Sequence, residues 1–384
     1  MIPVGNSQYQ KIANTCLILN LLRKGAMSRI EIADTLGLQA STVTYSTQRL
    51  INQGIIKECG LVESSGKGRK QKALSLNLDM GLVAGIELLV GFYRLSLVNI
   101  LGEVKLKIEL SYTVTYSKKG VELYKMRLKE ALEKAETLAS PFKLLGACIA
   151  IPGVVYPDPF TVEDCWTHGL KNVSFASFLS NYPYPVFFEN DANCSALRFL
   201  LKGNSFDDFI YILFRKHDVT DLPSDVPLIG IGSGLVISGK LYKGSHGRAG
   251  EFASNMIDST GHQVSLSNAR LSSLESDKKA IKALIREVFS NYLSSSCLID
   301  PSCLYIGGFL TEKPFIDVLN EVIEKEYKNR FGALLPYMKL KVSEDSSYDP
   351  SMGAACYILD WLFRVPQVGI TEEDERRFSI IGID

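Results

Sequence analysis

Residues 28–54 read SRIEIADTLGLQASTVTYSTQRLINQG, a stretch that predicts two short helices joined by a tight turn. Ser28 and Glu31 have the S-x-x-E spacing of a capping box, in which each side chain bonds to the backbone N–H of the other residue. The apolar residues behind this cap recur at helical spacing, which predicts a helix over 29–36 that Gly37 ends. The stretch therefore begins with a well-marked helix.

A further helix follows the turn, and we expect Ser41 to cap it and Gly54 to end it. Two helices separated by so short a turn are typical of a helix-turn-helix, whose second helix enters the major groove of DNA. The outward residues that we predict to contact base edges are Ser41, Thr42, Thr44, Tyr45 and Gln48. Arg49 is better placed to contact a phosphate.

The flanking segments complete this module over residues 1–78. Apolar positions spaced through 12–22 predict a first helix, and two β-rich stretches within 55–78 surround a glycine-broken basic tip, which predicts a wing. The cations of this tip that can reach phosphates or a minor groove are Lys67, Arg69, Lys70 and Lys72. The alternative interpretation is an ordinary three-helix scaffold with a solvated charged loop.

The formal net charge of the 384 residues is zero, with 42 Lys and Arg against 42 Asp and Glu. The balance is uneven, because residues 1–80 hold ten Lys and Arg against five Asp and Glu, so that segment carries +5 and the remainder −5. A basic segment beside a mildly acidic one is expected of a nucleic-acid-binding module attached to another domain. The length also predicts two or three globular units.

The sequence contains no segment that marks export or membrane insertion. No apolar run approaches the roughly 18 residues that span a bilayer, and the first residues lack the apolar core of a signal peptide. We therefore expect a cytoplasmic protein without a membrane partner. The eight cysteines are scattered without C-x-x-C spacing, so we expect buried thiols rather than a zinc cluster or a disulfide framework.

From Met80 onward the pattern changes to strands. Three β-rich runs within 82–110 predict a meander, with Gly102 in the turn between the last two. A helical stretch and the apolar strand at 144–155 follow, so strands and helices alternate as in an α/β protein. Residues 185–201 then read as strand, polar turn and helix.

Two motifs in this part, FFENDAN at 187–193 and GIGSGLVISGKLYKGSHGRAGEF at 230–252, resemble the ROK family, which is named for repressors, open reading frames and kinases. SRIEIADTLGLQASTVT at 28–44 and GKGRKQKALSLN at 66–77 resemble the DNA-binding half of that family's repressors. The resemblance implies an actin-like, hexokinase-type fold, in which two α/β lobes are joined by a hinge and a sugar lies in the cleft between them.

On this resemblance we divide the chain into three parts. The expected boundaries are a winged helix-turn-helix over 1–78, a first α/β lobe over 79–192 and a second α/β lobe over 193–384. A closing helix at about 350–364 is expected to pack back on the first lobe. In the tail that follows, the charged run EEDERR reads as a solvated segment, and the apolar end as one that can dock on a neighbour.

The family's kinases need a flexible glycine turn after the first strand, where backbone amides approach the ATP phosphates. The family pattern Asp-x-Gly-Gly-Thr is matched here by Glu87, Leu88, Leu89, Val90 and Gly91. Bulky residues at these positions should block a turn that wraps a phosphate, so we predict that the chain is not an enzyme and uses no cofactor. The family's other glycines are retained at Gly230, Gly232, Gly234, Gly307 and Gly308, either as a vestigial nucleotide site or because the fold needs tight turns there.

The sugar-side residues of the family are also retained. The resemblance places Asp191 where the kinases have their general base, and Asn190 and Glu251 where they bond the other sugar hydroxyls. Two carboxylates and an amide suit a polyol, because each carboxylate can accept bonds from vicinal hydroxyls. The alternative is that Asn190 and Asp191 cap the next helix, and the two roles are compatible.

The other wall of the expected pocket departs from the family pattern. Glu251 is followed by Phe252, Ala253 and Ser254 rather than by the family's Gly-His, and residues 259–273 contain no cysteine. We therefore predict no bound metal. His246 and His262 lie nearby in sequence and are expected to be surface residues or to have their hydrogen bonds satisfied, although either could face the cleft.

These observations favour a sugar-responsive DNA-binding regulator, in the sense of a repressor, with a kinase-like domain that has lost catalysis. Its expected partners are a double-stranded DNA operator, a sugar or sugar-phosphate effector and a second copy of the chain, as a homodimer or a dimer of dimers. Two alternatives remain open. One is a residual or bifunctional sugar kinase, and the other is a constitutive DNA-binding protein whose second part is only a scaffold.

Overall fold

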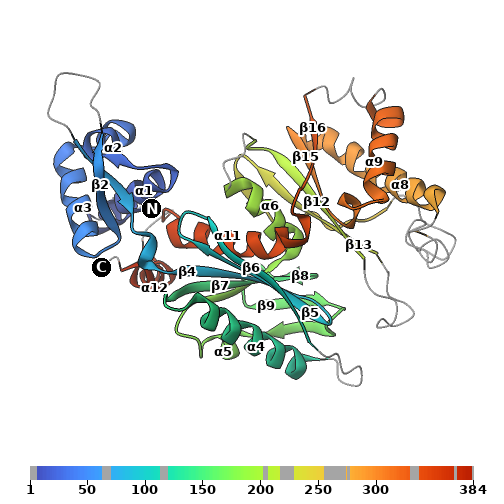
Figure 1. Ribbon diagram of the computed structural model, residues 1–384, viewed down its shortest axis with the longest axis horizontal. Helices are drawn as coiled ribbons and strands as arrows, with labels where there is room; N and C mark the ends of the chain where they lie inside the picture. The colour runs from blue at the N-terminus through green and yellow to red at the C-terminus, as the bar shows by residue number, and fades with distance from the viewer. Residues whose placement is uncertain are drawn as a thin grey trace.

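The computed structural model describes residues 7–62, 71–112, 120–201, 206–216, 229–254, 274, 277–328, 337–366 and 370–382. Figure 1 shows the N-terminal module at one end of the molecule and two sheets beyond it, with a long helix between the sheets. The three regions follow each other along the longest axis of the molecule. No helix of the described residues is long and apolar enough to cross a membrane.

The N-terminal module is a winged helix-turn-helix. Its elements are α1 (Ser7–Lys24), β1 (Met27–Ser28), α2 (Arg29–Leu36), α3 (Ala40–Asn52), β2 (Ile56–Val62) and β3 (Gln71–Leu76), with the strands in the order β1-β3-β2. The capping box is confirmed, because the Ser28 side chain accepts from the Glu31 N–H and the Glu31 carboxylate accepts from the Ser28 N–H at 2.7 Å. Gly37 ends α2 with a left-handed φ of 63°, as the sequence predicts.

The expected cap of α3 is wrong. The helix begins at Ala40, so Ser41 lies inside its first turn and does not cap it. Gln39 holds the cap position in an extended conformation without a side-chain hydrogen bond, and its carbonyl accepts from the Val43 N–H at 3.1 Å. A hydroxyl residue after a turn looks like a cap in the sequence, but this helix begins two residues earlier than a cap at Ser41 requires.

The first sheet has the strand order β11-β7-β4-β5-β6. Strands β7 and β11 run parallel to β4, whereas β5 and β6 form the antiparallel meander that the sequence predicts, with Gly102 in the turn before β6 at a φ of 84°. A small second layer of strands and a short helix lie beside it. The bounds are β4 (Leu82–Leu88), β5 (Phe92–Asn99), β6 (Val104–Ser111), α4 (Val121–Ala139), β7 (Leu144–Ile151), β8 (Val154–Val155), β9 (Thr161–Cys165), β10 (Leu170–Ser174), α5 (Ala176–Leu179) and β11 (Val186–Asn190).

The second sheet has the strand order β14-β13-β12-β15-β16. Alternate residues of β12 pack on opposite faces: Ile210 and Ile212 contact the core under α8 and α9, while Tyr211 and Leu213 contact α6. The bounds are α6 (Asp191–Leu201), β12 (Phe209–Lys216), β13 (Ile229–Ile237), β14 (Lys240–Tyr242), α8 (Lys278–Ile299), β15 (Cys303–Gly308), η4 (Phe309–Thr311), α9 (Phe315–Val322), η5 (Ile323–Tyr327), β16 (Lys339–Val342) and η6 (Ser346–Tyr348).

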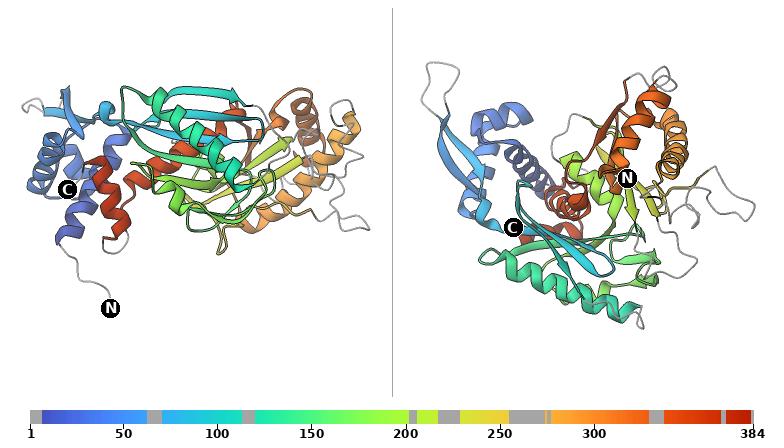
Figure 2. Two further views of the ribbon diagram at one scale, coloured as in Figure 1. Left: turned by 90° about the horizontal axis from the view of Figure 1, so that it is seen from below. Right: turned by 45° about the vertical axis from the view of Figure 1, so that its right-hand side comes forward.

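Helix α11 (Asp349–Phe363) lies between the two sheets, against α6 and strands β4, β5 and β7, as Figures 1 and 2 show. Its approach is close enough to require glycine on both sides. A Cβ on Gly85 of β4 would lie 1.8 Å from the carbonyl oxygen of Ser351, and a Cβ on Gly353 would lie 1.6 Å from the carbonyl oxygen of Cys194 in α6. This helix therefore contacts the first sheet and the α6 layer at once.

The last described helix, α12 (Glu372–Ile381), contains the charged run, in which Glu372, Glu373, Glu375 and Arg376 are exposed as expected, whereas Arg377 is buried. Arg377 is 2% exposed, donates to the carbonyl oxygens of Trp361 (3.0 Å) and Arg364, and pairs with Asp374. The Trp361 indole N–H donates in turn to Glu373 at 2.5 Å. The charged run is thus a helix held against the C-terminal end of α11.

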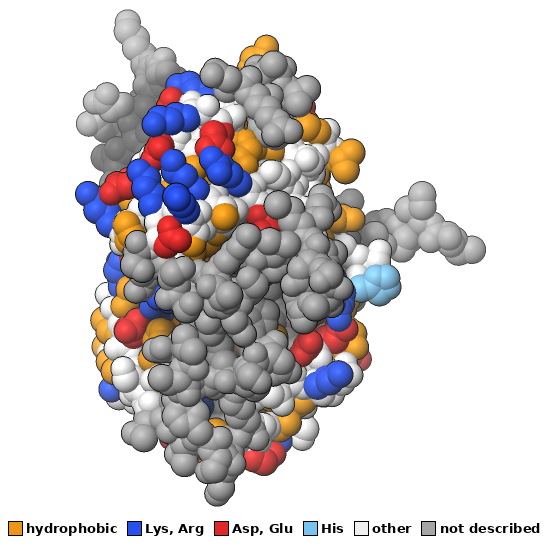
Figure 3. Space-filling model, turned by 90° about the vertical axis from the view of Figure 1, so that its right-hand side faces the viewer, with side chains coloured by type: hydrophobic (Ala, Val, Ile, Leu, Met, Phe, Trp, Pro, Cys, Tyr) orange, Lys and Arg blue, Asp and Glu red, His pale blue; other side chains and the backbone are white. Residues whose placement is uncertain are grey.

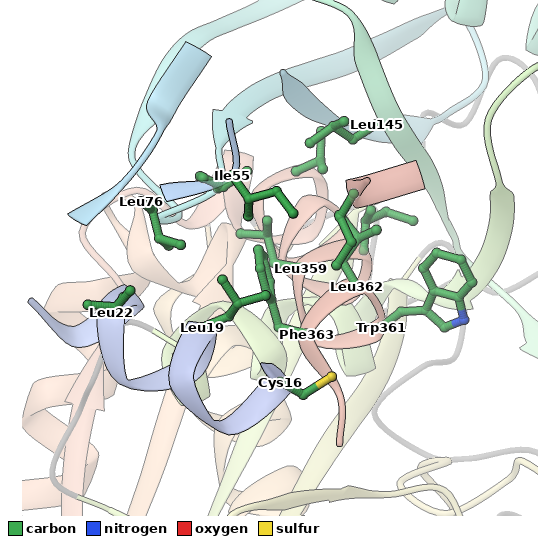
Figure 4. Close-up of a cluster of buried hydrophobic side chains, with 14 of the residues drawn as sticks. Cys16, Leu19, Leu22, Ile55, Leu76, Leu145, Leu359, Trp361, Leu362 and Phe363 are labelled. Carbon is green, nitrogen blue, oxygen red and sulfur yellow. The ribbon is translucent and has the colours of Figure 1, made fainter. Parts of the chain in front are cut away.

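A single hydrophobic cluster joins the winged module to the rest of the chain (Figure 4). It combines Leu19 of α1 and Ile55 before β2 with Leu362 and Phe363 of α11 and Phe378 of α12. Asn20 adds a hydrogen bond across the same junction, since its Nδ2 donates to the carbonyl oxygen of Phe363 at 2.7 Å. The module therefore packs firmly on α11 and α12.

The cysteines follow the sequence prediction with two exceptions. Six of the eight are buried and all eight are free, but Cys59 is half-buried and Cys297 is exposed. Burial raises the pKa of Cys165 to about 12, so this thiol is not ionised near neutral pH.

Candidate DNA-binding surface and ligand cleft

The outer face of α3 presents the residues that the sequence assigns to DNA. Ser41, Thr44, Tyr45 and Gln48 are exposed, and Tyr45 is 63% exposed, an unusual value for a large aromatic side chain. Thr42 and Arg49 are half-exposed. Val43, Ser46, Thr47 and Leu50 form the buried face of the same helix.

Two of the exposed polar residues already have partners within the helix. The Thr44 hydroxyl donates to the carbonyl oxygen of Ala40 at 2.8 Å, and the Gln48 amide donates to the Asn52 side chain at 3.1 Å. Neither bond uses all of the hydrogen-bonding capacity of its side chain. The α3 face therefore keeps polar groups and one aromatic ring available to a groove.

The wing is formed by β2 and β3, which pair antiparallel. Its predicted basic tip, with Lys67, Arg69 and Lys70, lies outside the described residues. Lys72, the fourth cation predicted in the tip, lies in β3, is exposed and pairs with Glu58 at 2.5 Å. Glu58 also contacts Arg29 of α2 at 3.5 Å. These pairs tie the wing strands to α2.

A second group of cations lies at the opposite end of the molecule, on α8, α9 and η5 (Figure 3). These cations are interleaved with acidic side chains. Lys278 and Lys282 both pair with Glu321 at 2.7 Å, and Arg286 pairs with Glu326 at 2.6 Å. Because these paired charges balance each other, they are less suited to DNA phosphates than an unpaired basic patch.

An arginine that the sequence analysis overlooked is at the centre of the cleft between the two sheets. Arg215, near the end of β12, donates from Nε to Asp191 and from Nη2 to Glu87 of β4. Glu87 is fully buried and Asp191 is 5% exposed. Arg215 therefore joins the two acids that the resemblance aligns with the kinases' phosphate-side acid and general base.

Glu87 has a second cationic partner. Arg94 of β5 lies opposite it in the antiparallel register and donates from Nη1 at 3.3 Å, while its Nε donates to Glu109 of β6 at 2.9 Å. A buried carboxylate needs such compensation, because removing one partner of a buried ion pair costs about 3–5 kcal/mol. Glu87 is thus held between two guanidinium groups.

A cavity of about 580 Å³ opens beside these charges. It is bounded by the β4–β5 turn on the first sheet, by the ends of β12 and β15 on the second, and by the segment before α11. Its polar lining includes Glu87, Arg94, Arg215, Ser346 and Ser347. Leu89, Val90 and Gly91, which the resemblance aligns with the kinases' Gly-Gly-Thr, line it as well.

The predicted sugar-side residues lie at the start of α6 and beside β13. Asn190 caps α6, because its Oδ1 accepts from the N–H groups of Ala192 (2.9 Å) and Asn193 (3.0 Å) and its Nδ2 donates to the carbonyl oxygen of Gly153 (3.0 Å). The capping role that the sequence left open for this residue is therefore present. Sugar binding by Asn190 stays a prediction.

The two carboxylates of this group influence each other. Burial raises the pKa of Asp191, Arg215 opposes that rise, and the charge of Glu87 adds to it. Glu251 forms an isolated antiparallel bridge with Gly232. Its side chain is exposed at the edge of the cleft, yet loss of water around its carboxylate raises its pKa, and the Asp191 charge adds to the shift.

The retained glycines serve close packing. Gly230, Gly232 and Gly234 all lie within β13 rather than in a turn. A Cβ on Gly234 would lie 2.5 Å from the carbonyl oxygen of Ala192 in α6, and one on Gly308 would lie 1.7 Å from the carbonyl oxygen of Phe214. Gly307 is similarly crowded by Tyr211. The fold therefore needs several of these glycines for reasons independent of a nucleotide.

Among the described residues, no cluster of three or more His, Cys, Asp or Glu side chains could hold a metal ion. His246 is exposed. His262 and the whole cysteine-free segment at 259–273 lie outside the described residues.

Comparison with known proteins agrees with this arrangement. A model described as winged helix-turn-helix DNA-binding matches residues 14–57, and the ROK family model matches residues 100–265. The middle of the chain thus resembles the ROK family. The chain is 27% identical over 290 residues to the xylose repressor of Caldicellulosiruptor bescii, covering 74% of this chain and 69% of that one. It is 26% identical over 273 residues to the N-acetylglucosamine repressor of Escherichia coli O6:H1, covering 69% of this chain and 62% of that one.

Solved ROK structures share the fold. A ROK family transcriptional regulator, described as a homologue of the Escherichia coli MLC protein, superposes with a TM-score of 0.75 at 20% identity, over 97% of this chain and 99% of that one. A ROK family glucokinase from Streptomyces griseus, in complex with glucose and AMPPNP, superposes with a TM-score of 0.53 at 17% identity, over 72% and 98%. The two-lobed, hexokinase-type expectation is confirmed.

Proposed function

We propose that this protein is a sugar-responsive, DNA-binding transcription regulator of the ROK family that acts as a repressor in the cytoplasm. The observation that carries the proposal is that one chain has both an exposed polar face on α3, suited to a DNA groove, and a cleft in which Asp191 is bound by Arg215. Relatives named as xylose and N-acetylglucosamine repressors support both the DNA operator and the sugar effector. The predicted binding residues on each side are those that the sequence singled out.

The contact between Asp191 and Arg215 also supports the loss of kinase activity. A kinase base must accept a proton from the attacking sugar hydroxyl, but Oδ2 of Asp191 already accepts from Arg215, a permanent cation. Leu89 and Val90 occupy the turn in which backbone amides would meet the phosphates. A coupled assay with ATP and a panel of sugars should show no turnover. Saturable turnover that Asp191→Asn removes would instead establish the residual kinase.

A route from the cleft to DNA runs along α11. Ser346, Ser347 and Pro350, at or just before its N-terminal end, line the cavity, and its C-terminal end packs on α1 and α12. A ligand changes DNA affinity only by binding one arrangement of the lobes more tightly than another. A helix that contacts both sheets and the winged module is suited to convert such a difference into movement of α3.

Binding as a homodimer completes the proposal. Two copies related by a two-fold axis would place their α3 helices in successive major grooves, which requires half-sites about one or more helical turns apart. Sites selected from random duplex DNA should therefore be palindromic. An asymmetric single half-site with full affinity would argue against the dimer.

The decisive test is fluorescence anisotropy with a selected DNA duplex, with and without sugars. Tyr45→Ala should change sequence preference without loss of stability, because this side chain is exposed. Tyr242→Ala, which removes an exposed tyrosine from β14, is the matched control and should leave DNA affinity unchanged. Removing the charges of Lys67, Arg69 and Lys70 together should weaken binding to all sequences and reduce its salt dependence. Unaltered sequence preference in Tyr45→Ala would refute the α3 assignment.

The scaffold alternative is tested by ligand-induced stabilisation. A sugar present at about a hundred times its dissociation constant should stabilise the fold by about 2.7 kcal/mol. If no sugar or sugar derivative shifts the thermal midpoint while DNA binding is intact, the second part of the chain is a scaffold only.

A further inference from the structure

Residues 243–251 form a crossing segment that leads from the second sheet to the first. Lys243 directly follows β14, and its ammonium group forms an ion pair with Glu189 near the end of β11. Four residues later, a Cβ on Gly247 would lie 2.5 Å from the carbonyl oxygen of Val155 in β8, beside the first sheet. The crossing segment therefore joins the two sides of the cleft.

Glu189 is a buried acid at the base of the predicted sugar side. It is 2% exposed, and its Oε1 accepts from the backbone N–H of Asn190 at 2.9 Å and from Nδ2 of Asn193 at 3.0 Å. Among the described residues, Lys243 is the only cation that forms an ion pair with Glu189. Removing one partner of a buried ion pair leaves an uncompensated charge, which is strongly destabilising. Any movement of the sheets that separates Lys243 from Glu189 is therefore costly.

Lys243 also contacts the helix that reaches the winged module. Its Nζ lies 5.3 Å from the ring centroid of Tyr357 in α11, within the range of a cation–π interaction. Tyr357 packs edge-on against Phe187, with centroids 5.8 Å apart, and Phe187 packs edge-on against Trp361 at 5.1 Å. Phe187 and Trp361 belong to the cluster that joins the winged module to the rest of the chain. A continuous row of side chains thus runs from the ion pair to that cluster.

We infer that Lys243 is a positioning residue of the sugar side, and that its ion pair with Glu189 transmits the state of the cleft to α11. Through Glu189 it holds the backbone of Asn190, and the crossing segment that carries Lys243 also carries Glu251. A sugar bonded to both Asn190 and Glu251 draws the crossing segment towards β11 and so favours the paired arrangement. The inference rests on the proposed function and adds the contact through which the ligand acts.

Fluorescence anisotropy of the full chain with the selected DNA duplex tests the transmission, with D-xylose, D-glucose and N-acetylglucosamine as probes. Lys243→Met removes the ammonium group and keeps an unbranched side chain beside Tyr357. For every probe that changes the DNA affinity of the wild-type chain, this variant should reduce the change by at least about threefold, as expected of a contact on a coupling route. Lys243→Arg keeps a cation beside Glu189 and should retain the change. Lys240→Met, which replaces an exposed lysine within β14, is the matched control and should behave as the wild type.

The double variant Lys243→Met/Glu189→Gln separates positioning from transmission. It also keeps the inference testable if the unpaired carboxylate of the single variant prevents folding. The oxygen of the introduced amide can still accept from the Asn190 N–H and from Asn193, but an amide needs no cation. In isothermal titration with the same probes, the double variant should therefore regain most of the sugar affinity that Lys243→Met loses. Its sugar effect on DNA should stay reduced.

Amide hydrogen exchange of the free protein provides a measurement that needs no sugar. The Asn190 N–H bonds to the Glu189 carboxylate, which loses its cation in Lys243→Met. Exchange at Asn190 should therefore be at least about tenfold faster in Lys243→Met than in Lys240→Met, because local opening becomes easier. Exchange of the α11 amides around Tyr357 should be faster as well.

Each failure has a separate meaning. A wild-type sugar effect on DNA in Lys243→Met, or unchanged exchange at Asn190, overturns the inference and leaves the proposed regulator intact. A double variant with a fully restored sugar effect on DNA also overturns it, because transmission then does not need the ion pair. Absence of any sugar effect on the wild-type chain overturns the proposed sugar response itself, and the exchange measurement still decides whether Lys243 positions Asn190.

Discussion

Replacing Phe378 with alanine tests whether α12 holds the winged module to the rest of the chain. Phe378 is 3% exposed and belongs to the cluster that joins α1, α11 and α12. Truncating a buried phenylalanine costs about 3–5 kcal/mol, because apolar area is lost and a cavity remains. With a urea dependence of about 3 kcal/mol per molar, the unfolding midpoint of the region around α12 should fall by about 1–2 M.

Trp361 supplies the local readout for this substitution. It is 4% exposed, its indole bonds to Glu373 of α12, and the chain has two tryptophans, so a Trp166→Phe background isolates its fluorescence. In that background, Phe378→Ala should shift the urea transition seen by Trp361. Ser379→Ala changes an exposed neighbour on the same helix and should alter stability by less than about 0.5 kcal/mol. A loss below about 1 kcal/mol in Phe378→Ala would refute the view that α12 is a structural element of the junction.

Three further outcomes are expected. Asn20→Ala leaves the last carbonyl of α11 without its donor and should lower the free energy of unfolding in urea by about 1–3 kcal/mol. In anisotropy, the effect of a sugar on DNA affinity should become smaller. An unchanged effect of the sugar would exclude this contact from the proposed route along α11. Gly353→Ala forces a Cβ against the Cys194 carbonyl and should lower the thermal midpoint by several degrees; a stable variant would show that α11 can shift. The raised pKa values of Asp191 and Glu251 mean that the folded chain takes up protons above the usual carboxyl range. As pH falls through that range, sugars should bind more weakly in titrations, because the carboxylates become protonated. Chemical denaturation should show a more stable free protein, because the folded state binds more protons than the unfolded state. Constant sugar affinity between pH 7 and 5 would contradict a role for ionised carboxylates.

Local signals in the sequence were sufficient for the winged module. The Ser28–Glu31 box, the left-handed Gly37 and the alternation of exposed and buried positions along α3 depend on neighbours within a few residues, and all are present. The cap at Ser41 was wrong because a hydroxyl residue near a turn does not specify which peptide first turns helical.

The centre of the cleft could not be found in the same way. Arg215 meets Glu87 and Asp191 only because β12, β4 and α6 converge in the fold, and no periodic pattern links positions so far apart in the chain. The available signal was a charged residue at the end of an otherwise apolar strand, FIYILF, which reads equally well as the start of a loop. The burial of Arg377 was hidden for a related reason, since a run of charges gives no indication of which member turns inward.

The shared core of α1, α11 and α12 also determines how a signal can be delivered to DNA. A DNA-binding module on a flexible linker could reorient by itself. Here the core of the winged module is continuous with α11 and α12, so the module must move together with these helices. In the proposed dimer, a small rotation between the lobes would therefore swing each α3 as the end of a lever and change the distance between the two recognition helices. The ligand state would then be detected at the operator through the distance between the two α3 helices, which either matches the distance between successive major grooves or does not.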